Sequence, residues 1–163
     1  MGMELTREDM ELMRRELDHR RLELGPGLLE AVKEARAFGD LSENFEYKAA
    51  RREKSRNDSR IRYLERVLAG AVLVEDCSGP DTVGLYDRVT LYLEEEDTEE
   101  VWQVVTAMRQ DVLQGRMSNQ SPVGRALLGA KVGQRLWVQG GGHMVVRAIE
   151  KGSDDGSAPL NPY

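Results

Sequence analysis

The sequence has little cysteine, histidine or aromatic content, and it has no long apolar run. Cys77 is the single cysteine among 163 residues, so the chain cannot form an internal disulfide, which agrees with a reducing compartment. No apolar run approaches the roughly 20 residues of a membrane-spanning helix, and Met1-Gly2-Met3-Glu4 does not begin a signal peptide. These absences predict a cytoplasmic protein with no membrane partner.

The motifs of self-sufficient enzymes are also missing. His19 and His143 are isolated, so the sequence offers no Cys/His cluster for zinc. The glycine run at 140–142 is not followed by the Gly-Lys-Ser/Thr of a phosphate-binding loop, and it is typical of a tight hairpin turn. Ser121 has no adjacent base to activate it, which favours a helix-capping role.

The net charge of −6 hides an uneven distribution. Residues 33–66 hold ten Lys/Arg against seven Asp/Glu, whereas residues 75–100 hold ten Asp/Glu against one Arg. A net acidic chain is a poor candidate for free, non-specific DNA binding. A basic stripe can still meet a nucleic acid held by another protein, although a solvated helical face with i,i+4 ion pairs explains the same charges.

Helical patterns occupy the first half of the chain. Thr6 as N-cap with Asp9 three residues later forms a capping box at the start of the first helix. Gly25-Pro26-Gly27 predicts a kink or an end in that helix, because proline removes a helical hydrogen bond, and the helical pattern then resumes up to Phe38. We predict a second helix from about Leu41 to Leu68.

The second helix carries a heptad seam, which is the pattern of a coiled coil. The seam residues are Tyr47, Ala50, Lys54, Asn57, Ile61, Leu64 and Leu68. We therefore predict an antiparallel α-helical coiled-coil hairpin over residues 1–74.

The second half changes to short β-like runs, at 71–74, 85–93 and 101–108, with an acidic hairpin turn at 94–97. Ser121 as N-cap and Pro122 at the first helical position open a short helix. Two further strands are expected at 135–139 and 144–149. The fold class is therefore α+β, with a small α+β domain over residues 75–151 and a disordered tail over residues 152–163.

The tip of the hairpin carries two acidic side chains, Asp40 and Glu43, directly after Gly39. This position suits the delivery of carboxylates into a deep, narrow site on another molecule. The same spacing also fits a capping box, with Asp40 as N-cap and Glu43 at the third helical position. The spacing leaves both interpretations open.

Two longer motifs carry a family resemblance. Residues 36–51, RAFGDLSENFEYKAAR, resemble the tip signature of the bacterial GreA/GreB transcript cleavage factors, and residues 118–129, SNQSPVGRALLG, resemble the signature of their C-terminal domain. The similarity runs from about Leu5 to Lys151. Within this family, the intact acidic pair argues against a cleavage-inhibiting homologue, and the modest basic patch resembles GreA more than GreB.

The resemblance implies a fold and a function. Members of this family bind backtracked RNA polymerase through an FKBP-like C-terminal domain at the rim of the secondary channel, and Ser121 and Pro122 match the part that faces the polymerase. The protein acts as a monomer, and its coiled coil enters the channel. The polymerase then hydrolyses the 3′ end of its own nascent RNA. The protein itself is then no enzyme and holds no stable cofactor of its own.

The resemblance also assigns roles at the tip. Asp40 and Glu43 match the pair that helps to hold the second Mg²⁺ of the polymerase active centre and to position the attacking water. Ser42, Asn44 and Tyr47 match the scaffold of the tip.

Arg36 and Arg51 match basic positions that face the RNA 3′ segment. An alternative role for both arginines is ion pairing with neighbouring carboxylates such as Glu34 or Glu46.

Two other functions compete with transcript cleavage. One is a Gre-like channel-binding protein that modulates or inhibits polymerase without promoting cleavage. The other is an FKBP-type prolyl isomerase with a helical arm. That enzyme needs an aromatic-lined apolar pocket, and the second half offers few aromatic residues for it: Tyr86, Tyr92, Trp102, Trp137 and Tyr163.

Overall fold

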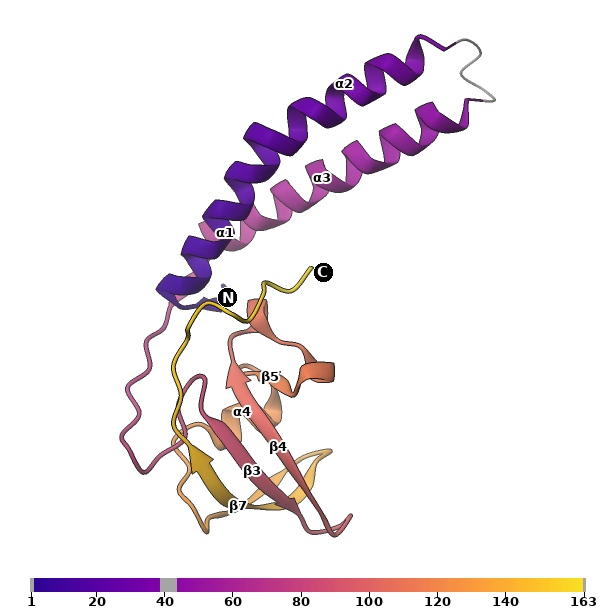
Figure 1. The fold of residues 1–163 in the computed structure, drawn as a ribbon. Helices are drawn as coiled ribbons and strands as arrows, with labels where there is room; N and C mark the ends of the chain where they lie inside the picture. The colour runs from indigo at the N-terminus through magenta and orange to yellow at the C-terminus, as the bar shows by residue number, and fades with distance from the viewer. Residues whose placement is uncertain (1, 39–43, 163) are drawn as a thin grey trace. The chain divides into compact units, whose positions relative to one another are not determined.

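The computed structural model describes residues 2–38 and 44–162 (Figure 1). The chain divides into two compact units, one formed mainly by Met10–Ala71 and the other by Met3–Asp9 together with Val72–Tyr163. The expected division between residues 74 and 75 is close to this one. The first residues of the chain differ from expectation, because they belong to the second unit rather than to the hairpin.

The first unit is a helical hairpin, as predicted. It contains most of α1 (Arg7–His19), the whole of α2 (Gly25–Arg36) and the whole of α3 (Phe45–Ala69). Figure 1 shows α2 and α3 side by side as two arms. The 25 residues of α3 give this arm a length of about 37 Å at the helical rise of 1.5 Å per residue.

The predicted capping box at the start of α1 is confirmed. The backbone N–H of Thr6 donates to Asp9 Oδ2 over 2.9 Å, and the N–H of Asp9 donates to Thr6 Oγ1 over 3.2 Å. Two N–H groups that the helix itself leaves without acceptors are thereby satisfied.

Of the two outcomes expected at Gly25-Pro26-Gly27, an end of the helix is not observed, and the helix is instead distorted just before Pro26. A π-helical segment, Arg20–Leu24, joins α1 directly to α2. Gly25 donates its N–H to the Arg20 carbonyl, five residues back, so the wider turn accommodates a proline that has no N–H to give. A Cβ on Gly25 would lie 3.0 Å from the Arg20 carbonyl oxygen, which explains the glycine at this position.

The heptad seam of α3 is confirmed by its burial pattern. Tyr47, Asn57 and Leu64 are buried, and the other four seam positions are half-buried. The buried Asn57 amide donates to the Arg20 carbonyl over 3.2 Å and accepts from Arg20 Nη1 over 3.0 Å. A buried polar pair of this kind fixes the register of two helices, so the seam aligns the π-helical segment with the middle of α3.

The start of α3 differs from the prediction. The helix begins at Phe45, and Asn44 is its N-cap, with Asn44 Oδ1 accepting from the Tyr47 N–H over 2.9 Å. Asn44 therefore takes the capping role that the sequence offered to Asp40. Asp40, Ser42 and Glu43 lie outside the described residues.

The second unit is built on a five-stranded sheet of order β5-β4-β3-β7-β6. Its strands are β3 (Arg88–Leu93), β4 (Thr98–Val105), β5 (Arg116–Ser118), β6 (Arg135–Val138) and β7 (Gly142–Glu150). β3 and β4 form the predicted antiparallel hairpin across the acidic turn. A separate two-stranded sheet pairs β1 (Glu4–Leu5) with β2 (Val72–Leu73) in parallel.

The helix α4 (Pro122–Leu127) follows β5, as the Ser-Pro signal predicted. Apolar residues of the sheet and of α4 form one core, in which Val89, Val104, Leu127 and Val146 are fully buried. The α+β fold class is thus confirmed. The parallel strand β5 was not predicted, because three residues are too short to show a period of two.

The tail from residue 152 forms no helix or strand among its described residues, yet it makes specific contacts. Asp154 accepts two hydrogen bonds from Arg109, over 2.7 and 2.8 Å. The Asn161 N–H donates to the Met108 carbonyl, and Ala158 is buried. The structure differs here from the expected disorder, because the tail supplies groups that a buried arginine requires.

Within residues 2–38 and 44–162, no helix is both long and apolar enough to cross a membrane.

Candidate functional site

The candidate site lies at the end of the helical hairpin, where α2 ends and α3 begins. Of the predicted site residues, Arg36, Asn44, Tyr47 and Arg51 are described, and they come together across these two helix ends.

Asn44 joins the two arms of the hairpin. Its Nδ2 donates to the Ala35 carbonyl over 2.6 Å, while its Oδ1 accepts from the Tyr47 N–H over 2.9 Å. One side chain thus bonds a carbonyl at the end of α2, which also accepts from the Phe38 N–H, and an N–H at the start of α3 that the helix itself leaves without an acceptor. The scaffold role predicted for Asn44 has a clear physical basis in these two bonds.

Tyr47 holds both predicted arginines. Its hydroxyl accepts from Arg36 Nη2 over 3.0 Å, and the guanidinium carbons of Arg36 and Arg51 lie 5.4 and 5.7 Å from its ring centroid. The hydrogen bond from Arg36 and the positive charges of both arginines lower the pKa of the Tyr47 hydroxyl, more than its desolvation raises that pKa. Tyr47 also packs with Val32, Ala35 and Ala50 in a small apolar layer.

Neither arginine pairs with a carboxylate among the described residues. The ion pairs considered for Arg36 with Glu34 and for Arg51 with Glu46 are not formed in residues 2–38 and 44–162. Both guanidinium groups are instead held against the Tyr47 ring, where cation–π attraction stabilises them.

Two exposed aromatic residues at this end were not predicted as site residues. Phe38 follows α2 and is 73% exposed, and Phe45 opens α3 and is 78% exposed. The sequence carried a signal for Phe45, because it lies two residues before the seam position Tyr47 and so falls outside the apolar face.

The predicted docking pair lies at the start of α4. Ser121 Oγ accepts from the Gly124 N–H over 3.1 Å and donates to the Ser118 carbonyl over 2.6 Å. Pro122 is exposed at the first turn. A Cβ on Gly124 would lie 2.1 Å from the Ser118 carbonyl oxygen. Capping thus accounts for Ser121 locally and leaves the surface of Pro122 open to a partner.

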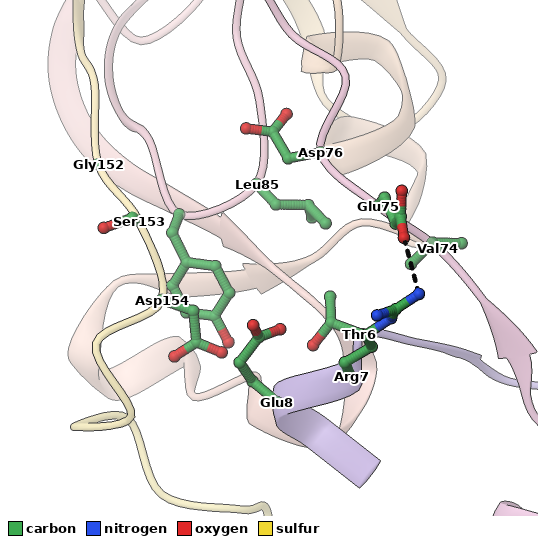
Figure 2. Close-up of a pocket in the computed structure, with 11 residues that line it drawn as sticks. Thr6, Arg7, Glu8, Val74, Glu75, Asp76, Leu85, Gly152, Ser153 and Asp154 are labelled. Carbon is green, nitrogen blue, oxygen red and sulfur yellow. Dashed lines mark ion pairs between the residues drawn. The ribbon is translucent and has the colours of Figure 1, made fainter. Parts of the chain in front are cut away.

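A pocket of about 360 Å³ lies elsewhere in the second unit, between the start of α1, the segment at Val74–Asp76 and the tail (Figure 2). Figure 2 shows Glu8, Asp76 and Asp154 around it, with an ion pair between Arg7 and Glu75 at 3.7 Å. Among the described residues, no group of three His, Cys, Asp or Glu could hold a metal ion.

Tyr86 forms one wall of this pocket in a left-handed backbone conformation, with φ of 69°. Its N–H donates to the Val104 carbonyl, and its carbonyl accepts from Gln103 Nε2. These bonds hold a conformation that costs a bulky residue energy. Burial raises the pKa of the Tyr86 hydroxyl, so it is not an acid–base group near neutral pH.

Both halves of the chain match models of one protein family. Residues 3–73 match the model described as transcription elongation factor, N-terminal, and residues 78–151 match the C-terminal model of the GreA/GreB transcription elongation factors. The chain belongs to the GreA/GreB family of transcription elongation factors. The two matched regions meet close to the division between the two units of the structure.

Individual members of the GreA/GreB family agree with this assignment. A transcription elongation factor GreA of Geobacillus kaustophilus is 38% identical over 147 residues, which cover 89% of this chain and 93% of that protein. The GreA of Thermotoga neapolitana is 38% identical over 138 residues, covering 85% of this chain and 88% of that protein.

A solved structure is also similar. It is the GreA factor homolog 1 (Gfh1) protein of Thermus thermophilus, which is 30% identical with a TM-score of 0.44 and covers 93% of this chain and 100% of that one.

Proposed function

We propose that this family member binds backtracked bacterial RNA polymerase and stimulates the cleavage of the nascent RNA 3′ end by the polymerase. The hairpin would enter the secondary channel and present Asp40 and Glu43 to the active centre. One observation supports this proposal most strongly: Arg36 and Arg51 flank the same end of the hairpin with no carboxylate partner among the described residues.

The chemistry of the tip residues fits a metal held mainly by another protein. Asp40 and Glu43 would supply oxygen ligands, which are the donors that Mg²⁺ prefers. Two carboxylates alone make a weak metal site. Such a pair binds the ion usefully where another protein, here the polymerase, would supply the remaining ligands. In a two-metal site, Mg²⁺ stabilises the attacking and leaving oxygens of a phosphodiester.

The other tip residues of this chain would position the reacting groups. Asn44 ties the start of α3 to the end of α2 through its bonds to the Tyr47 N–H and the Ala35 carbonyl. Tyr47 holds the guanidinium groups of Arg36 and Arg51 at the same helix ends. These cations would attract the RNA phosphates and hold the 3′ segment for hydrolysis.

The second unit would carry the docking surface. Ser121 and Pro122 begin α4, and Pro122 offers an exposed apolar side chain there. In this proposal the factor acts as a monomer in the cytoplasm and is not a catalyst by itself. The polymerase would perform the hydrolysis, and the factor would raise its rate.

The test is the addition of the protein to a purified elongation complex that has been stalled and allowed to backtrack. We expect the labelled RNA to shorten from its 3′ end in a Mg²⁺-dependent manner, and elongation to resume when nucleotides are added. Binding without RNA shortening, or with slower intrinsic cleavage, would favour an inhibitory channel-binding protein instead.

A further inference from the structure

Two phenylalanines at the end of the hairpin lie outside the apolar layer of that region. Tyr47, Val32 and Ala35 form this layer, whereas Phe38 and Phe45 expose 73% and 78% of their surface. Phe45 occupies the first helical position after the N-cap Asn44 and is not part of this layer. Neither ring stabilises the described hairpin by burial.

One cation lies beside the Phe45 ring, and two more lie on the ring of Tyr47, two residues further along α3. Lys48 Nζ lies 5.7 Å from the centroid of the Phe45 ring, and Arg36 and Arg51 lie on the adjacent Tyr47 ring. Residues 33–38 and 44–52 together hold five Lys/Arg against two Asp/Glu. Lys48 shares with the two arginines the lack of a carboxylate partner within the described ranges.

We propose that Phe45, assisted by Phe38, is a stacking platform for an unpaired base of the RNA 3′ segment. Exposed aromatic faces beside a cationic groove are the combination by which proteins bind single-stranded nucleic acids: the rings stack on bases while the cations follow the phosphates. The positive charge of this surface favours an RNA strand over an apolar protein segment as its occupant. The inference rests on the proposed function, since the RNA must reach this end of the hairpin.

Stacking at Phe45 has a consequence for substrate preference. Hydrogen-bond readout plays no part in such a contact, so the preference follows the stacking strength of the base. A purine offers a larger face than a pyrimidine. Backtracked complexes with an extruded 3′ purine should therefore need less factor for half-maximal cleavage than otherwise identical complexes with a pyrimidine.

The test uses elongation complexes assembled on synthetic RNA that ends in a purine, a pyrimidine or an abasic nucleotide. The full-length protein is compared with Phe45→Ala, with Phe45→Trp and with the matched control Leu22→Ala, which removes a side chain that is also 73% exposed on the same unit. Loss of one stacked base should raise the half-maximal concentration of Phe45→Ala by about five-fold or more on the purine complex. Phe45→Trp and Leu22→Ala should behave as the unmodified protein does.

The abasic complex separates base stacking from other contacts. With no base to stack, the unmodified protein and Phe45→Ala should need the same concentration. An equal loss for Phe45→Ala on all three RNAs would show that Phe45 contacts the polymerase, and no loss on any of them would assign it no contact. Either result overturns the inference while cleavage by the unmodified protein upholds the proposed function.

Discussion

Asp9 and Arg109, separated by 100 positions in the sequence, form a fully buried ion pair within the second unit. Asp9 Oδ1 lies 3.1 Å from Arg109 Nη1, and neither side chain is exposed. Asp154 binds the same guanidinium with both carboxylate oxygens, and the Arg109 Nε donates to the Ala158 carbonyl over 2.6 Å. The unit therefore requires both its first residues and the tail.

This arrangement predicts that Asp9→Asn strongly destabilises the second unit. The change leaves Arg109 with Asp154 as its remaining carboxylate partner among the described residues and weakens the bonds that Asp9 accepts from Thr6, Thr106 and Arg109, and a buried hydrogen bond to a charged group contributes about 1.5–3 kcal/mol. Trp102 and Trp137 both belong to this unit, so tryptophan fluorescence during urea unfolding reports on it. The control Glu11→Gln removes an exposed ion pair with Arg15 and should change stability by less than about 1 kcal/mol. Equal effects of the two changes would contradict the role given to Asp9.

Asp154 predicts how the same unit responds to acid. Burial raises the pKa of the Asp154 carboxyl, but hydrogen bonds from Arg109 and from the Gly156 N–H lower that pKa by more. The net pKa is therefore below its usual value. A carboxyl of this kind stabilises the fold above its unfolded pKa of about 3.9, and the stabilisation is lost as the pH falls through the folded value.

The free energy of unfolding, measured from pH 7 down to pH 2, should therefore decrease once the pH is lower than about 4. Asp154→Asn should be less stable at pH 7 and should show a smaller loss on acidification. An unchanged slope in this variant would mean that Asp154 has no part in the acid response.

Asn44 predicts a graded effect on the hairpin. Asn44→Ala removes the N-cap and the bond to the Ala35 carbonyl, and we expect it to lower the stability of α3 by about 1–2 kcal/mol. Asn44→Asp keeps an acceptor for the Tyr47 N–H but loses the donor to Ala35, so its loss should be smaller. Thermal unfolding followed by the circular dichroism signal of the helices measures the stability of both variants. An Asn44→Asp variant less stable than Asn44→Ala would contradict the roles given to the two Asn44 hydrogen bonds.

The charges of Arg36 and Arg51 lead to a prediction for cleavage. Arg36→Glu or Arg51→Glu should raise the concentration of factor for half-maximal RNA cleavage by about ten-fold, which corresponds to about 1.4 kcal/mol of lost binding. Arg62→Glu makes the same charge change on an exposed residue of α3 that bonds only Ser59 among the described residues, and it should have little effect. Similar losses in all three variants would indicate a general charge effect rather than local contacts with RNA.

Local signals in the sequence predicted the features that depend on neighbouring residues. The capping box at Thr6 and the Ser121 cap each need partners three residues away, and both are present. The seam of α3 was predictable because coiled-coil burial repeats along one helix. The hairpin of β3 and β4 with its acidic turn followed equally from patterns within short segments, whereas the strand order of the sheet was not predicted.

Features that depend on distant partners were not predictable from one sequence. The π-helical segment Arg20–Leu24 lets the chain pass Pro26 without ending the helix, because helix is favoured on both sides of the proline. Asn57 of the other arm donates a hydrogen bond to the Arg20 carbonyl in this segment. The order of the tail depends on Arg109, which gives no signal of burial in the sequence. The tip scaffold was assigned by resemblance, and the structure supplies its physical basis in the bonds of Asn44 and Tyr47.

The central claim is that the carboxylates of Asp40 and Glu43 promote RNA cleavage by the polymerase. The most direct measurement compares the protein with its Asp40→Asn, Glu43→Gln double variant in a backtracked elongation complex, with polymerase binding measured in parallel. Both changes keep the size of the side chains and remove only charge. We expect binding to be retained and stimulated cleavage to fall to the intrinsic rate of the polymerase. A folded, bound double variant that still stimulates cleavage would contradict the account.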